Sequence, residues 1–91
     1  MHGEYKTPSG KLVVVDFGVD DGRLSEVVVS GDFFLEPPEA LADIVRALED
    51  ARADLGEEGL ARRIRDALDE GVEMVGFSPE AIARATVRGL G

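Results

Sequence analysis

Short apolar blocks and alternating positions dominate the first third of the chain. The segments KLVVVDF (11–17) and RLSEVVVS (23–30) are rich in β-branched residues, which favours strands. Between them, GVDDG (18–22) contains an Asp-Gly step with flanking glycines, which is typical of a hairpin turn. A Gly-Asp step interrupts the second apolar run, and FFLE (33–36) follows as a short third strand. Because the links are short, the pattern predicts an antiparallel meander.

The period of the pattern changes after a pair of prolines. Apolar residues then recur at i, i+3, i+4 and i+7, which predicts helices over about 38–53 and 57–70. Ser78, followed by proline and glutamate, is a helix-start signal for a third helix. Strands followed by helices indicate an α+β fold of two layers, in which a three-stranded antiparallel meander sheet carries two to three helices on one face. Residues 1–10 show no periodicity and are expected to form an N-terminal arm, with a single domain over 11–91.

The composition fits one small globular domain. The chain has 91 residues, of which 44% are hydrophobic, enough for a modest core. No apolar run approaches the roughly 18 residues of a membrane span, and no charged-then-apolar leader opens the chain. The absence of cysteine excludes a disulfide framework, a thiolate metal site and a thiol nucleophile. We therefore expect a cytoplasmic protein.

The charge balance is strongly acidic. Nineteen Asp and Glu residues face ten Lys and Arg residues, which gives a formal net charge of −9. Such a surface repels phosphate backbones, so nucleic-acid binding is not expected. Lys6 and Lys11 are the chain's lysines, and the other basic residues are arginines. Abundant carboxylates with scarce lysine suit a halophilic archaeal source, where salt screens self-repulsion. A GC-rich genome, which also replaces Lys with Arg, is the alternative explanation.

No combination of residues in the sequence indicates a catalytic centre. His2, the single histidine, lies in the expected arm, where we expect it to be mobile and incidental. Asp20 and Asp21 are adjacent carboxylates in the hairpin turn, and Glu57 and Glu58 begin an expected helix, where they favour the helix dipole. No metal-ligand set, phosphate-binding glycine loop or nucleophile–base pair accompanies them. Catalysis by this chain alone is therefore not expected.

One corner of the chain holds half of its four phenylalanines, as the adjacent pair Phe33 and Phe34. Neighbouring strand residues point to opposite faces of a sheet, so one ring should pack beneath the helices and the other should lie on the second face. A phenylalanine left in water forgoes roughly 1.5–3 kcal/mol of burial. A bare apolar patch therefore usually marks an interface. Either the arm 1–10 covers the second ring, or the ring contacts another chain.

The same corner resembles a known family. YKTPSGKLVVVDF followed by DGRLSEVVVSGDFFLEPPEAL resembles the accessory, or C-terminal, domain of lipoate–protein ligases, which in some archaea is a separate small subunit. The shared pattern is a Lys-x-Pro-x-Gly-Lys-Leu start, a glycine-turn hairpin, Gly-Asp-Phe-Phe and a proline-led helix. The resemblance covers residues 5–48 closely and the later helices only in general pattern. The matching residues are Lys6, Pro8, Gly10, Lys11, Leu12, Gly31, Asp32, Phe33, Phe34 and Pro37 or Pro38.

The resemblance implies a function that needs a second chain. In the family, a large catalytic domain activates lipoate with ATP to lipoyl-AMP and passes the lipoyl group to a lysine of a carrier domain. This chain would be the accessory subunit of that ligase, binding no cofactor itself, while ATP, Mg and lipoate bind the catalytic lipoate–protein ligase subunit. Lipoyl carrier domains would be indirect partners, with no nucleic acid and no membrane. The implied fold is that of iron–sulfur scaffold proteins (SufE/NifU-like), whose cluster function is excluded here by the lack of cysteine.

We expect the partner contact at the aromatic corner. Gly31 and Asp32 are expected to shape the turn that presents the rings. Lys11 is a candidate for facing a nucleotide phosphate, and the alternative is a solvated strand end. Two other functions stay open: a non-catalytic interaction module for another partner, and a stand-alone enzyme, for which the sequence offers no residue set. The predicted interface residues are Lys6, Lys11, Gly31, Asp32, Phe33 and Phe34.

Overall fold

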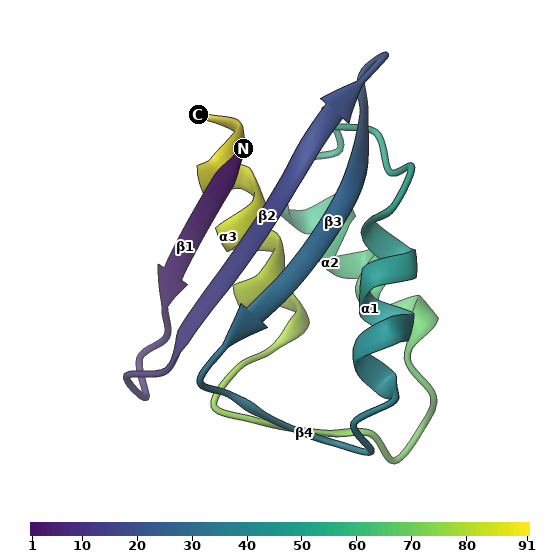
Figure 1. Cartoon of the computed structure of the whole chain (residues 1–91). Helices are drawn as coiled ribbons and strands as arrows, with labels where there is room; N and C mark the ends of the chain where they lie inside the picture. The colour runs from purple at the N-terminus through teal and green to yellow at the C-terminus, as the bar shows by residue number, and fades with distance from the viewer.

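A computed structural model describes residues 1–91, and Figure 1 shows their arrangement as a sheet with helices on one side. The three strands of the main sheet are β1 (His2–Lys6), β2 (Leu12–Asp20) and β3 (Arg23–Gly31). The other elements are β4 (Phe34–Glu36), α1 (Ala40–Leu48), α2 (Gly56–Ala67), β5 (Glu73–Val75) and α3 (Pro79–Leu90). The expected two-layer α+β fold, with a three-stranded antiparallel sheet and three helices, is confirmed.

The third strand of the main sheet is β1, and not the FFLE segment. The sheet order is β1-β2-β3, and β1 pairs antiparallel with β2 over its whole length. The expectation of an irregular arm is therefore wrong for residues 2–6, which are a regular strand. The helix-facing positions of β1 include Gly3, which is buried, and Tyr5, which is half-buried. Because a glycine adds no apolar side chain to the pattern, the strand period is hidden in the sequence.

The FFLE segment leaves the main sheet and forms a separate two-stranded ribbon. β4 pairs antiparallel with β5, with Phe34 opposite Val75 and Glu36 opposite Glu73. In Figure 1 this ribbon runs below the lower end of the main sheet. The Gly-Asp step that suggests a bulge in the sequence is instead the point where the chain departs from β3.

The helices begin close to their expected positions, and the first two end early. The Ser78 hydroxyl accepts a hydrogen bond from the Ala81 N–H at 3.1 Å and caps α3. α1 stops early because the chain then runs beside β3, where the Asp50 N–H donates to the Leu24 carbonyl at 2.8 Å. α2 also ends early, at Ala67, whereas the sequence pattern extends to about residue 70.

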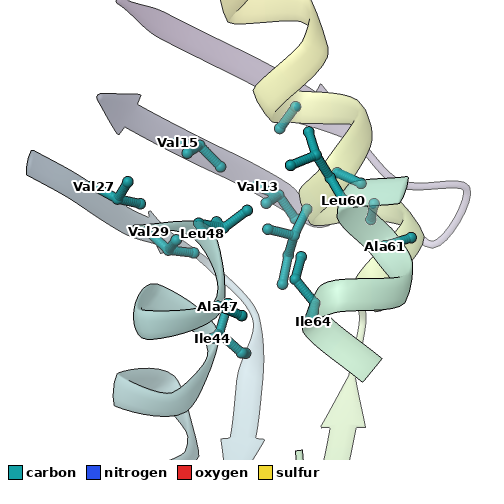
Figure 2. Close-up of a cluster of buried hydrophobic side chains, with 14 of the residues drawn as sticks. Val13, Val15, Val27, Val29, Ile44, Ala47, Leu48, Leu60, Ala61 and Ile64 are labelled. Atoms are coloured by element: carbon teal, nitrogen blue, oxygen red, sulfur yellow. The ribbon is translucent and has the colours of Figure 1, made fainter. Parts of the chain in front are cut away.

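The helices bury the inner face of the main sheet. Figure 2 shows valines of β2 and β3 facing Ile44 and Leu48 of α1 and Leu60 and Ile64 of α2. These four side chains are 0% exposed, and burial of each contributes roughly 1.5–3 kcal/mol. α3 packs against β1, β2 and α2, so the opposite face of the sheet is left without a helix. None of the helices combines the length and apolar character that crossing a bilayer requires.

Candidate functional site

The predicted interface residues come together at one end of the domain. β1 ends at Lys6 and β3 ends at Gly31, and the links that follow them lie beside β5, at the bottom of Figure 1. We call this region, formed by residues 6–12, 31–36 and 73–77, the basal end. It contains every residue that the sequence predicts for the partner contact: Lys6, Lys11, Gly31, Asp32, Phe33 and Phe34.

Gly31 and Asp32 close the main sheet at the basal end. The Asp32 carboxylate accepts a hydrogen bond from the Leu12 N–H at 2.5 Å, and the Asp32 N–H donates to the Leu12 carbonyl at 3.2 Å. Gly31 has a φ of 149°, and a Cβ on this residue would overlap the same carbonyl oxygen. These two residues therefore fix the start of β2 and turn the chain toward the phenylalanine pair.

The two phenylalanines have different environments. Phe33 stacks on Phe77, with ring centroids 4.0 Å apart and planes at 22°, and packs against the core. Phe34 is 59% exposed, and Val75, its neighbour across the ribbon, is 53% exposed. The expectation of one packed and one bare ring is confirmed, and coverage of the second ring by residues 1–10 is wrong. We call the exposed apolar pair Phe34 and Val75 the ribbon patch.

Two residues of the basal end are missed by the sequence reasoning. Val75 falls in a segment that reads as a connector, because the three residues of β5 are too few to show a strand period. The Thr7 hydroxyl donates to the Gly76 carbonyl at 3.0 Å and accepts from the Lys11 N–H at 3.2 Å. Thr7 thereby ties the link between β1 and β2 to the end of β5, a contact between segments far apart in the sequence.

Lys6 and Lys11 are free cations at the basal end. Both are exposed, and neither has a carboxylate oxygen within 4.0 Å. The Lys11 stem lies over Gly76, where an added Cβ would come within 2.5 Å of the Lys11 Cγ. The basal end therefore combines a bare aromatic ring with two lysines that form no ion pair, although it also contains the carboxylates of Asp32, Glu36 and Glu73.

His2 is part of an ordered cluster on the open face of the sheet, so the expectation of a mobile histidine is wrong. Its Nδ1 lies 2.5 Å from an Asp16 carboxylate oxygen, and its Nε2 lies 2.6 Å from a Glu4 carboxylate oxygen. The pairing of β1 with β2 places His2 directly opposite Asp16. The hydrogen bond to Glu4, followed by that to Asp16, raises the pKa of His2 above its ordinary value of 6.5.

This cluster predicts a small dependence of stability on pH. Because the folded pKa of His2 lies above its unfolded value, its stabilising contribution should be complete below about pH 6.5 and should disappear as the pH rises through the folded pKa. NMR titration of the His2 ring protons would give that pKa. In a His2→Gln variant, the same loss of melting temperature with rising pH should be absent. A folded-state pKa at or below the unfolded value would contradict the prediction.

A hollow of about 440 Å³ lies between the link after β1 and the start of α3. Its charged side chains are already paired, Arg84 with Glu57 at 3.0 Å and Glu80 with Arg65. The hydrogen bond from the Arg84 guanidinium lowers the pKa of Glu57. The hollow therefore presents mainly hydroxyl groups and two aromatic rings, those of Tyr5 and Phe77. Its lining includes Tyr5, Thr7, Ser9, Phe77 and Ser78.

The sequence is similar to one curated archaeal protein. It is 32% identical over 74 residues to lipoate-protein ligase A subunit 2 of Thermoplasma acidophilum, an alignment that covers 81% of this chain and 74% of the relative. No protein-family model matches the chain.

The fold is similar to a solved structure from the same organism. That structure is described as an archaeal lipoylation system from Thermoplasma acidophilum, a bipartite lipoate protein ligase and its E2 lipoyl domain. The TM-score is 0.72 at 27% identity, and the match covers 94% of this chain and 97% of the other. Similar sequence over most of both chains, with the same fold, shows that this chain belongs to the family of lipoate–protein ligase A subunit 2, the accessory subunits of bipartite lipoate–protein ligases.

Proposed function

We propose that this chain is required, together with a separate catalytic subunit, for ATP-dependent activation of lipoate to lipoyl-AMP and for protein lipoylation. The chain itself carries no catalytic residue in this proposal. ATP, Mg and lipoate bind the catalytic subunit, and lipoyl carrier domains are the acceptors. No group of three or more His, Asp or Glu side chains in this chain is arranged so that it could hold a metal ion.

The ribbon patch is the observation that carries the proposal. Phe34 and Val75 are both more than half exposed and face each other across β4 and β5, so they form one apolar surface. Exposed apolar side chains that adjoin one another in this way favour a protein interface. Lys11 lies over Gly76, the residue after Val75, and Lys6 ends the strand β1 at the same end of the domain. Gly31 and Asp32 turn the chain toward this surface, and Phe33 anchors it on Phe77. We therefore assign the basal end as the contact with the catalytic subunit.

Reconstitution tests the proposed function. The catalytic subunit from the same source should show little lipoate-dependent ATP–pyrophosphate exchange alone. We expect at least about a tenfold increase when this chain is added in equimolar amount, because domain contacts commonly complete catalytic geometry. Mass spectrometry of a lipoyl carrier domain would follow the complete transfer. Full exchange and full carrier modification by the catalytic subunit alone would contradict the proposal.

A further inference from the structure

The two edges of the main sheet differ in their hydrogen bonding. The outer edge of β3 is covered by the chain after α1, where Leu24 exchanges backbone hydrogen bonds of 2.8 Å with Asp50 and Ala51. Farther along the same edge, the Val27 N–H donates to the Glu49 carboxylate at 2.5 Å. These contacts block this edge of the sheet against pairing with another strand.

The outer edge of β1 is open. Thr7 donates to the Lys11 carbonyl at 2.8 Å, and Phe17 donates to the Met1 carbonyl at 2.9 Å. Since bonded and non-bonded pairs alternate along an antiparallel ladder, the odd-numbered residues of β1 bond to β2. No strand lies on the far side of β1 (Figure 1). The outward-pointing backbone groups therefore belong to His2, Glu4 and Lys6.

One side-chain hydrogen bond from within the chain reaches the outward-pointing backbone groups of β1. The Arg88 guanidinium donates to the Glu4 carbonyl at 3.4 Å, and the same guanidinium lies 5.0 Å from the centre of the Tyr5 ring. No backbone group bonds to the outward N–H of any of these residues. The β1 edge is thus a ready template for an added strand.

Positive charge gathers around this edge, although the whole chain is acidic. Lys6, Lys11 and Arg88 lie on or beside β1, and none has a carboxylate oxygen within 4.0 Å. Most of the remaining basic residues are paired, as Arg84 is with Glu57. The carboxylate of β1 itself, that of Glu4, is already paired with His2 at 2.6 Å. An extended segment that carries carboxylates would therefore find complementary charge here.

We propose that the β1 edge binds an extended acidic segment of the catalytic subunit by strand addition. This inference rests on the proposed function and specifies how that partner is held. The added segment would extend the main sheet to a fourth strand, next to the ribbon patch at the basal end. A second copy of this chain fits less well. In an antiparallel pair centred on Glu4, the two Glu4 carboxylates would face each other, which is destabilising.

Amide hydrogen exchange in the free and bound chain tests the inference directly. In the free chain the Glu4 and Lys6 amides should exchange rapidly, whereas the Tyr5 amide, bonded to β2, should be protected. Addition of the catalytic subunit should slow exchange at Glu4 and Lys6 by at least about tenfold. Unchanged exchange at both amides in the saturated complex would overturn the inference. If the Glu4 and Lys6 amides are protected equally well in the free chain at high concentration, the edge binds a second copy of this chain. That result would also overturn the inference.

Two matched substitutions at Glu4 measure how much its backbone N–H contributes to binding of the catalytic subunit. Glu4→Pro and Glu4→Ala both remove the carboxylate, but only the proline also removes the outward N–H. The Kd for the catalytic subunit should be about tenfold higher for the proline variant than for the alanine variant. Equal Kd values in two folded variants would overturn the inference. The amide spectrum of β2 checks folding, and if Glu4→Pro does not fold, the exchange experiment decides alone.

Charge reversal separates this inference from the proposed function. Lys6→Glu combined with Arg88→Glu should weaken binding and reduce its dependence on salt concentration. If the wild-type chain fails to bind or stimulate the catalytic subunit, the proposed function itself fails. If binding persists and depends on the ribbon patch, while the amide exchange at Glu4 and Lys6 is unchanged, only strand addition is wrong.

Discussion

Replacing Phe34 by threonine is expected to weaken binding to the catalytic lipoate–protein ligase subunit about 10- to 100-fold, because an interface-buried phenylalanine contributes roughly 1.5–3 kcal/mol. Phe34 is 59% exposed in the isolated chain and adjoins the exposed Val75. Threonine favours strands, so the ribbon should keep its pairing while losing the ring. Isothermal titration calorimetry would give the Kd, and ATP–pyrophosphate exchange at limiting chain concentration should fall in parallel.

Val28→Thr is the matched control for this substitution. Val28 is 56% exposed on the open face of the main sheet, away from the ribbon. It is also a strand residue, so the change to threonine has similar consequences for folding. We expect its Kd to stay within about twofold of the wild-type value, as for most surface substitutions outside a contact. Equal binding by both variants would remove the ribbon patch from the interface and with it the central support for the proposed contact.

Much of the basal end can be predicted from the sequence, because short stretches of neighbouring residues determine its structure. At Gly31 the backbone has a positive φ, which favours glycine, and at Asp32 a short side chain accepts a backbone hydrogen bond. Both requirements can be recognised from the residue types alone. Adjacent phenylalanines necessarily diverge wherever the backbone is extended. The split between a packed Phe33 and a bare Phe34 therefore holds, although the segment belongs to the ribbon and not to the main sheet.

The errors arise where long-range contacts override local pattern. β1 lacks an apolar alternation because Gly3 occupies a buried position on its inner face. β5 is too short to show a period, and it becomes a strand because β4 lies beside it. α1 ends early because Asp50 and Ala51 bond to β3. In each case the deciding interaction joins segments distant in sequence, which neither propensity nor spacing reports.

Adding a methyl group at Gly3 is expected to have the largest effect on stability of any change discussed here. A Cβ on Gly3 would overlap the carbonyl oxygen of Ala85 and come within 2.7 Å of the Gly89 nitrogen, both in the backbone of α3. Backbone atoms of a packed helix cannot move aside as a side chain can. Gly3→Ala should therefore reduce the free energy of unfolding by about 1–3 kcal/mol or detach β1 from α3. Thermal unfolding followed by circular dichroism should show a melting temperature lower by about 4–8 °C per kcal/mol.

Gly18→Ala tests whether the close approach of β1 to α3 causes this loss. Gly18 is also a strand glycine, but its added Cβ would lie 3.0 Å from the Ser25 hydroxyl, which can rotate away. The Gly18→Ala substitution should therefore lower the free energy of unfolding by no more than about 0.5 kcal/mol. Wild-type stability of Gly3→Ala, with normal β1 amide signals, would mean that β1 does not lie against α3 as described. The same result would undermine the position of the open edge, because the even-numbered amides of β1 point outward and stay available to a partner strand only while its odd-numbered residues are paired with β2 as described.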